Sequence, residues 1–278
     1  MKAPSTVTVA LAAAQRLGLA RLDTQLLLGH LLQRPRSWLI AHDDAALTAV
    51  QVRAFEALAA RRAAGEPLAY LVGEREFHGL RLAVDRATLV PRPETELLVD
   101  WAIECLRRDE GGSAGVAQVL DLGTGSGAIA LAVKRACPFA AVAALDVSEN
   151  ALAVARHNGA ALGLEIEWLH SDWWCALGER RFDLLLSNPP YIAEGDRHLD
   201  ALAHEPALAL TAGPQGLDAL HHLIATAPHH LSQSGRLLLE HGHDQREAVR
   251  RLLADAGFGA IETRLDLAGH PRCSGGRL

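Results

Sequence analysis

The sequence has few lysines, few cysteines and no long apolar run, and each shortage excludes a class of protein. Lys2 and Lys134 are its only lysines, which indicates a bias towards arginine codons, so the arginine count says little about function. The four cysteines form no Cys-x-x-Cys pair, which argues against a disulfide framework and a zinc knuckle. No apolar run reaches the ~18 residues that a membrane span needs. We therefore expect a cytoplasmic protein with reduced thiols and no membrane partner.

A positive field that would attract nucleic acid is also missing. The chain of 278 residues carries 27 basic and 33 acidic side chains, a net charge of −6. The imbalance is uneven, because residues 1–90 hold 11 basic and 8 acidic groups, whereas the remainder holds 16 and 25. The length is nearly twice that of a typical domain of ~150 residues, so we predict two units. From the charges we expect these units to have different surfaces and no direct nucleic-acid partner.

Hydropathy patterns divide the chain into three parts. Apolar side chains repeat at helical spacing in the first part, which predicts a small helical bundle domain over residues 1–75. Residues 76–90 begin with alternating apolar and polar side chains, so we expect an extended hairpin that acts as a linker. Residues 91–278 form the larger domain.

The larger domain alternates strands and helices. Strands are predicted at 116–122, 140–145, 165–170, 182–187 and 236–240, and helices at 95–107, 127–136, 149–162, 217–230 and 243–256. Helices of this length between strands require right-handed crossovers and hence a mainly parallel sheet. Two further strands, at 260–264 and 273–278, would add an antiparallel edge pair. The prediction is an α/β fold with a mainly parallel seven-stranded sheet.

A glycine-rich turn follows the first strand of this sheet. It runs from Asp121 to Ala128 with the sequence DLGTGSGA, at the edge where open α/β sheets bind ligands. The spacing also satisfies the dinucleotide fingerprint, with Asp146 about 20 residues further on to hold a ribose. A third interpretation is that the glycines only permit close packing of helix on strand.

Charge favours S-adenosylmethionine over NAD at this turn. Asp121 would set a negative charge beside a pyrophosphate, whereas S-adenosylmethionine has no phosphate and carries an ammonium and a sulfonium. Asp146 would accept the ribose hydroxyls, and Trp173 would flank the adenine unless it or Trp174 is a core residue. We predict cofactor contacts from Asp121, Gly123, Thr124, Gly125, Ser126, Gly127, Asp146 and Trp173.

The sequence Asn188-Pro189-Pro190-Tyr191 follows the fourth strand of the sheet and carries the strongest chemical signal. Asn188 and both prolines favour extended backbone. Neither proline has an N–H that could join the hydrogen-bond ladder of a sheet, so we expect the Pro189 carbonyl to stay free. A conjugated NH2 group needs two acceptors that hold its hydrogens and direct its lone pair at a methyl donor. Asn188 and Pro189 supply them, and Tyr191 would lie flat against the acceptor. We predict these three as catalytic residues; the alternative is a plain proline-rich turn.

The fourteen histidines do not indicate a metal site. The pairs His221-His222 and His229-His230 are adjacent on helices, where neighbouring side chains diverge by ~100° and cannot converge on one ion. For Glu240, in a leucine-rich strand, we favour a structural or substrate-loop role over that of a general base.

The chain resembles the protein-(glutamine-N5) methyltransferases that act on peptide chain release factors, over nearly its whole length. The segments that carry the resemblance are Gly73–Leu80, Val90–Glu96, Asp121–Gly127, Asp146, Ser171–Trp173, Asn188–Tyr191 and Leu238–Gly242. The Asn-Pro-Pro-Tyr motif alone is shared with N6-adenine methyltransferases of nucleic acids, whereas its combination with Arg92–Glu96 and a helical N-terminal domain is more specific.

The resemblance implies a class I, Rossmann-like S-adenosylmethionine-dependent methyltransferase whose residues 1–75 recognise the substrate and whose residues 91–278 are catalytic. It implies methyl transfer to the glutamine of the Gly-Gly-Gln motif in class 1 release factors, with Asn188 also touching the cofactor. Asn188, Pro189, Pro190 and Tyr191 would bind the glutamine. Phe77 and Glu96 match positions near the active site, unless Phe77 is linker core and Glu96 a first-turn helix acid.

Three alternatives remain open. A ribosomal-protein glutamine N5-methyltransferase would share the site, an adenine methyltransferase would need a basic groove, and a cofactor-binding module would transfer no methyl group to any acceptor. We expect a monomer, and the roles of Arg92 and Glu240 are left open.

Overall fold

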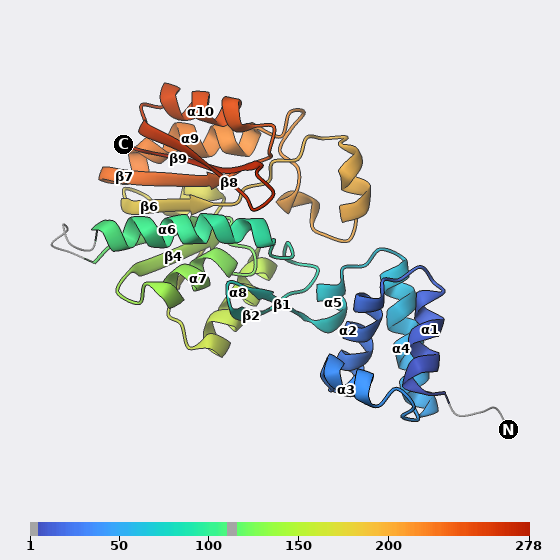
Figure 1. The fold of residues 1–278 in the computed structure, drawn as a ribbon. Helices are drawn as coiled ribbons and strands as arrows, with labels where there is room; N and C mark the ends of the chain where they lie inside the picture. Colours follow the sequence, from blue (N-terminus) through green and yellow to red (C-terminus); the bar gives the residue numbers. More distant parts are fainter. Residues whose placement is uncertain (1–4, 110–115) are drawn as a thin grey trace. The chain divides into compact units, whose positions relative to one another are not determined.

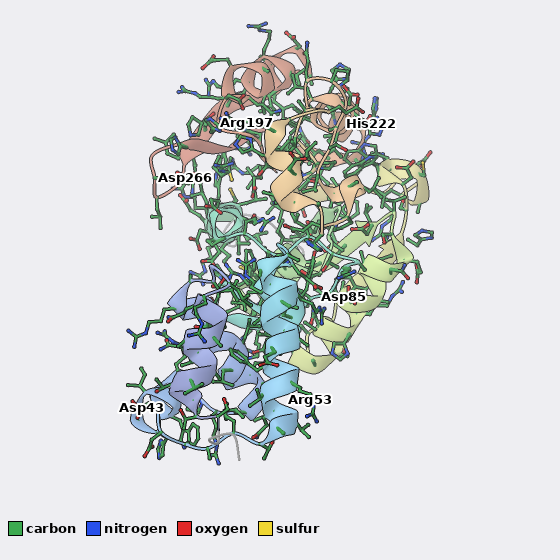
Figure 2. All side chains as sticks on the ribbon, turned by 90° about the vertical axis from the view of Figure 1, so that its right-hand side faces the viewer. Asp43, Arg53, Asp85, Arg197, His222 and Asp266 are labelled. Atoms are coloured by element: carbon green, nitrogen blue, oxygen red, sulfur yellow. The ribbon has the colours of Figure 1, made fainter. Side chains whose placement is uncertain are left out.

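The computed structural model describes residues 5–109 and 116–278, which belong to two compact units, 1–74 and 75–278. Charged side chains lie at the surface of each unit, for example Asp43 and Arg53 in the first and Arg197 in the second (Figure 2). Within the described residues, no helix is both long and apolar enough to cross a bilayer.

The first unit is a helical bundle, as predicted. Its helices are α1 (Val7–Gln15), α2 (Arg21–Leu32), α3 (Arg36–Ala41), α4 (Ala49–Ala63) and α5 (Leu68–Val72). The start of α4 is fixed by a capping box, because the Thr48 side chain accepts from the Gln51 backbone N–H while the Gln51 side chain accepts from the Thr48 N–H. Leu27, Leu28 and Phe55 fill the core of the bundle.

The second unit is built on the predicted seven-stranded sheet (Figure 1). Its strands are β3 (Gln118–Leu122), β4 (Ala141–Asp146), β5 (Glu167–His170), β6 (Phe182–Ser187), β7 (Leu231–Glu240), β8 (Gly259–Leu265) and β9 (Pro271–Arg277). The strand order is β5-β4-β3-β6-β7-β9-β8, and only β9 pairs antiparallel with its neighbours β7 and β8. The mainly parallel sheet and the antiparallel pair at its edge are therefore confirmed.

Helices cover both faces of this sheet (Figure 1). They are α6 (Glu96–Asp109), α7 (Ala128–Ala136), α8 (Glu149–Leu162), α9 (Asp218–His230) and α10 (Arg246–Asp255), with short 3-10 turns at Pro93–Thr95, Trp173–Ala176, Arg197–Leu202 and Ala207–Ala209. Successive residues of β3 point to opposite faces: Val119 joins the core under α6 and α7, and Leu120 joins the core under α9 and α10. Such two-sided burial explains why the strands read as continuous apolar runs.

The predicted hairpin is present as β1 (Glu74–Phe77) and β2 (Leu80–Ala83). Its apolar side chains pack into the core of the second unit, and Asn158 of α8 binds both backbone groups of Ala83 at 2.7 and 3.0 Å. The hairpin is thus an integral part of the second unit. The separate functions assigned to the two domains stay predictions.

The largest difference from the predicted strands is at β7, which begins at Leu231 rather than at residue 236. Leu231 pairs with Phe182 across a bulge, and α9 runs directly into the strand. The extra residues include Ser232, Gln233 and Ser234, which lack the apolar pattern from which strands are predicted.

The buried face of β6 gives a stability prediction. We expect Leu185→Ala to lower the free energy of unfolding by about 2–5 kcal/mol, because the side chain is fully buried between the sheet and α9. Leu267→Ala, at an exposed position, should change it by less than about 0.5 kcal/mol. Urea denaturation of the three proteins measures both; equal losses would contradict the assignment of this core.

Candidate active site

The carboxyl ends of three neighbouring strands bring the predicted site residues to one edge of the sheet. In the parallel register, Leu122 of β3 lies beside Ser187 of β6, which lies beside Leu239 of β7. The Ser187 hydroxyl donates to the Leu122 carbonyl at 2.6 Å and ties the first two strand ends together. The glycine-rich turn, the Asn-Pro-Pro-Tyr segment and Glu240 therefore start from adjacent positions.

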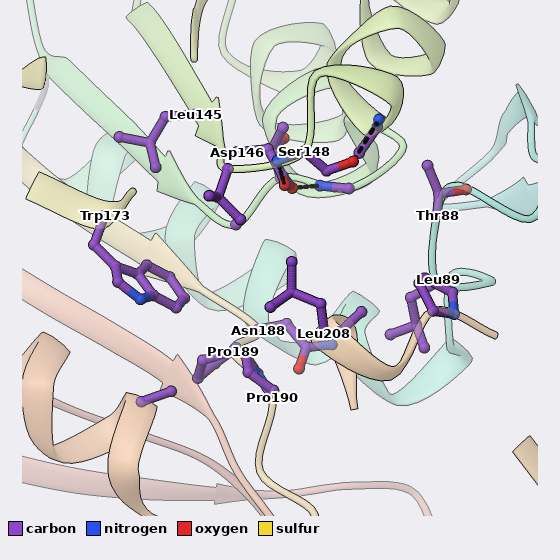
Figure 3. Close-up of a pocket in the computed structure, with 18 of the residues that line it drawn as sticks. Thr88, Leu89, Leu145, Asp146, Ser148, Trp173, Asn188, Pro189, Pro190 and Leu208 are labelled. Atoms are coloured by element: carbon purple, nitrogen blue, oxygen red, sulfur yellow. Dashed lines mark hydrogen bonds between the residues drawn. The ribbon is translucent and has the colours of Figure 1, made fainter. Parts of the chain in front are cut away.

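A pocket of about 880 Å³ opens at this edge. Trp173 and Asp146 lie on one side and the Asn188-Pro189-Pro190 segment on the other, and Leu208 also lines the pocket (Figure 3). Of the residues predicted from the sequence, Gly123, Thr124, Gly125, Ser126, Asp146, Trp173, Asn188, Pro189 and Pro190 line the pocket, and Asp121, Gly127 and Tyr191 do not.

Asp146 is held at the end of β4 by backbone donors. Its Oδ2 accepts from the Gly125 N–H at 2.8 Å, and its Oδ1 accepts from the Ser148 N–H at 2.9 Å. Burial raises the pKa of Asp146, and these backbone hydrogen bonds oppose the rise. Each carboxylate oxygen keeps a second lone pair, so the residue can still accept ribose hydroxyls from the pocket.

The glycines of the turn have different functions. Gly125 has a φ of 56° and lines the pocket, where an added Cβ would meet no atom within 4 Å. Gly127 has a φ of 84°, and an added Cβ would lie 3.0 Å from Leu131 and 3.1 Å from Trp168. Gly127 thus fits the packing interpretation, whereas Gly125 leaves room for a ligand.

Asp121 lies beneath the turn and is fully buried. Its Oδ2 accepts from the Thr124 hydroxyl at 2.6 Å and from the Ala130 N–H at 3.2 Å. Desolvation raises the pKa of Asp121 to about 7, although these hydrogen bonds act in the opposite direction. The side chain shapes the turn from below, and any direct contact with a ligand stays a prediction.

Asn188 and Pro189 offer two acceptors to the pocket. The Asn188 Nδ2 donates to the Thr95 hydroxyl at 3.1 Å, so Oδ1 is the side-chain atom left to receive a hydrogen bond. The Pro189 carbonyl accepts no hydrogen bond within the described part of the chain. Thr95, at the end of the 3-10 turn before α6, was predicted only as the start of a helix and as part of the Val90–Glu96 segment of the resemblance.

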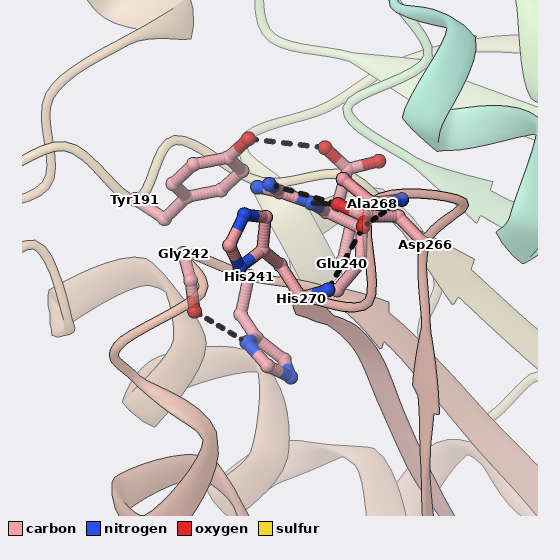
Figure 4. A network of polar contacts seen from close by, with 8 residues as sticks. Tyr191, Glu240, His241, Gly242, Asp266, Ala268 and His270 are labelled. Carbon is pink, nitrogen blue, oxygen red and sulfur yellow. Dashed lines mark hydrogen bonds and ion pairs between the residues drawn. The ribbon is translucent and has the colours of Figure 1, made fainter.

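Tyr191 does not line the pocket. Its hydroxyl donates to Glu240 Oε1 at 3.0 Å, and its ring packs against the core under α9 and α10 (Figure 4). The expected contact of the Tyr191 ring with the acceptor amide stays a prediction.

Sequence analysis did not identify Glu205 and left the role of Arg92 open. The Arg92 guanidinium pairs with the buried Glu205, which also accepts from the Val90 N–H at 3.0 Å. Arg92 also lines the pocket, and this pair ties its segment to the one that carries Leu208. Such long-range partners have no local sequence pattern.

Phe77 and Glu96 lie outside the pocket lining. Phe77 is 1% exposed and belongs to the core under α6, and Glu96 accepts from the His78 N–H at 2.9 Å, which fixes the hairpin turn. These contacts fit the structural alternatives given for both residues.

The pocket fits S-adenosylmethionine. Asp146 can hold ribose hydroxyls, the Trp173 ring lies 3.5 Å from an added Cβ at Gly123 and can flank a flat base, and Gly125 leaves room beside them. The buried carboxyl of Asp121 beneath the turn disfavours a pyrophosphate there.

Comparison with known proteins shows which families the chain matches. Residues 5–73 match the family model described as the PrmC N-terminal domain, and residues 103–213 match the methyltransferase small domain. A solved methyltransferase from Pyrococcus furiosus is similar in fold, with a TM-score of 0.52 and 19% identity over 72% of this chain and 88% of the other.

Curated relatives extend the similarity over almost the entire chain. The release factor glutamine methyltransferase of Bordetella pertussis is 48% identical over 264 residues, 94% of this chain and 96% of the relative. That of Xylella fastidiosa (strain Temecula1) is 46% identical over 277 residues, 99% of this chain and 98% of the relative. Identity at this level over this length means that the chain belongs to the release factor glutamine methyltransferase family.

Proposed function

We propose that this protein transfers a methyl group from S-adenosylmethionine to the side-chain amide nitrogen of the glutamine in the Gly-Gly-Gln motif of class 1 release factors. The observation that carries the proposal is the pair of acceptors at the pocket wall. Because the Asn188 Nδ2 is bound to Thr95, Asn188 Oδ1 and the Pro189 carbonyl remain for the two hydrogens of an NH2 group. Membership of the family supports glutamine as the bearer of that group.

The residues act by orientation. When bound, S-adenosylmethionine supplies an electrophilic methyl carbon on a sulfonium. Asn188 Oδ1 and the Pro189 carbonyl each accept a hydrogen bond from the NH2 group of the glutamine side chain. These two hydrogen bonds draw the nitrogen out of conjugation and direct its lone pair into the pocket. Asp146 and Trp173 hold the cofactor on the opposite wall. After methyl transfer the amide nitrogen carries a positive charge, and its proton is strongly acidic. This proton is lost readily, so no dedicated base is required.

The remaining assignments are also proposals. The helical unit would select the release factor, the protein would act as a monomer in the cytoplasm, and no nucleic acid or membrane would be bound directly. The net charge of −6 supports the absence of a nucleic-acid partner.

Mass spectrometry of the Gly-Gly-Gln peptide tests the function. Purified protein, S-adenosylmethionine and release factor should give a peptide heavier by one methyl group, located on the glutamine. Parallel incubations with ribosomes and with protein-free RNA and DNA test the alternatives. Methylation of a ribosomal protein or of adenine, with an unmodified release factor, would overturn the proposal.

Removal of the side-chain acceptor should abolish most of the activity. We expect Asn188→Ala to lower kcat for the release factor by about 10²-fold or more, because one of two preorganised acceptors is lost. Asn150→Ala, an exposed asparagine on α8, is the matched control and should leave kcat unchanged. Near-full methylation by Asn188→Ala would refute this account of the site.

The two glycines should separate binding from packing. Gly125→Ala directs a methyl group into the pocket and should weaken S-adenosylmethionine binding by about tenfold, or 1.4 kcal/mol. Gly127→Ala adds close contacts to Leu131 and Trp168. It should lower the free energy of unfolding by about 1–3 kcal/mol more than Gly125→Ala does. Calorimetric titration and urea denaturation measure the two effects; the reverse pattern would contradict the roles given to the glycines.

A further inference from the structure

A loop that follows the Asn-Pro-Pro-Tyr segment forms part of the pocket wall. The chain leaves that segment at Ile192 and returns beside it, because the Ile192 N–H donates to the Leu210 carbonyl at 2.9 Å and the Ala212 N–H donates to the Ile192 carbonyl at 3.1 Å. Residues 193–209, all of which the structure describes, lie between these contacts and contain 3-10 turns but no α-helix or strand. The base of the loop therefore lies next to the two proposed acceptors.

The buried side chain of this loop is a carboxylate. Across residues 193–209, every one of them described, Glu205 is the only buried residue. Its Oε2 accepts from the Val90 N–H at 3.0 Å, and its Oε1 accepts from the Arg92 guanidinium at 2.5 Å. A loop that buries no apolar side chain of its own is ordered by few contacts, so these two hydrogen bonds fix where it stands.

The partners of Glu205 belong to a second segment of the pocket wall. Leu89, Pro91 and Arg92 line the pocket in that segment, and Leu208 lines it in the loop, whereas Glu205 itself does not. Glu205 thus joins two parts of the wall that are more than a hundred residues apart in the chain, since it lies 113 residues from Arg92.

A short, restricted stretch of chain connects Glu205 to Leu208. Pro206 follows directly with a φ of −66°, and the 3-10 turn Ala207–Ala209 is closed by the Leu210 N–H, which donates to the Ala207 carbonyl at 3.0 Å. Leu208 lines the pocket and is nevertheless 65% exposed, so its side chain lies at the mouth (Figure 3). The position of Glu205 therefore sets the position of Leu208.

The mouth is where the main chain of an acceptor polypeptide must lie. A glutamine side chain is short, so when its NH2 group reaches Asn188 and Pro189 the main chain stays outside the pocket. An exposed leucine at that place gains free energy by burying apolar area against the polypeptide. The residues proposed to hold the cofactor, Asp146 and Trp173, lie on the opposite wall.

We propose that Leu208 contacts the main chain of the acceptor polypeptide and that Glu205 is a positioning residue, which holds Leu208 at the mouth through its hydrogen bonds to Val90 and Arg92. The proposal rests on the proposed function. It adds determinants of acceptor binding that lie apart from the group that receives the methyl.

Truncation of the leucine tests the contact itself. Leu208→Ala should raise KM for the release factor about tenfold, because apolar area at the mouth is lost. Both kcat and KM for S-adenosylmethionine should stay within about threefold of wild type, since the two acceptors and the opposite wall are untouched. Thermal stability should not change at this exposed position. An unchanged KM for the release factor would overturn the proposal.

A double-mutant cycle tests whether Glu205 acts through Leu208. Glu205→Gln keeps the shape but weakens the pairing with Arg92, and should also raise KM for the release factor about tenfold. If both substitutions remove the same contact, the double variant should show about tenfold, not about a hundredfold. A hundredfold increase would mean that the two residues act independently and would overturn the positioning role.

Asp266 in the β8–β9 turn provides a matched control. Its side chain is 7% exposed, accepts from the Ala268 and His270 N–H groups at 3.0 and 2.9 Å and pairs with Arg272, and none of these residues lines the pocket. Asp266→Asn should lower thermal stability to a similar degree as Glu205→Gln and leave KM unchanged. Equal increases in KM would assign the effect to general destabilisation and overturn the proposal.

Hydrogen exchange tests the positioning without turnover. Because the Val90 N–H is bound to Glu205, peptides that cover residues 86–92 and 203–212 should exchange faster in folded Glu205→Gln than in the wild type. The same peptides should be unchanged in Asp266→Asn. Unchanged exchange in Glu205→Gln would overturn the positioning role.

The two hypotheses fail in different ways. If the wild-type protein leaves the release factor unmodified, the proposed function is wrong. If the wild type methylates the release factor and both Leu208→Ala and Glu205→Gln retain its KM, the function stands and the roles given to these two residues are wrong.

Discussion

The parallel register of β3, β6 and β7 is the constraint on which the site depends. It aligns Leu122, Ser187 and Leu239, so that three segments leave the sheet side by side. A shift of one residue would turn every side chain of a strand to the opposite face of the sheet. Because both faces of the sheet are buried, apolar alternation alone does not fix this register, and the Ser187 hydroxyl helps to fix it by its bond to the Leu122 carbonyl.

Much of the fold could be predicted from the sequence because its signals are local. The β6 bounds, Phe182–Ser187, were predicted to the residue, since an apolar run ends there in two prolines. The glycine-rich turn was also predicted from a local signal, the sequence DLGTGSGA at residues 121–128. The direction of Tyr191 could not be predicted, because a tyrosine after two prolines can turn to the pocket or to the core, and its partner Glu240 is 49 residues away.

Long-range polar pairs were the other limit. Thr95 and Asn188 are 93 residues apart, and Arg92 and Glu205 are 113 apart. In the sequence Thr95 has the pattern of a helix cap, which explains it fully at the local level. Only the tertiary structure shows that its hydroxyl accepts a hydrogen bond from the Asn188 Nδ2.

The two acceptors that an NH2 group needs are fixed by different physics. The Pro189 carbonyl is fixed covalently, because flanking proline rings restrict the backbone and no N–H competes for the oxygen. The Asn188 oxygen sits at the end of a rotatable side chain whose two ends are alike in shape, so covalent restriction cannot select it. In this structure its orientation goes with one contact: the Asn188 Nδ2 donates to the buried Thr95 hydroxyl at 3.1 Å, which leaves Oδ1 as the acceptor for the pocket.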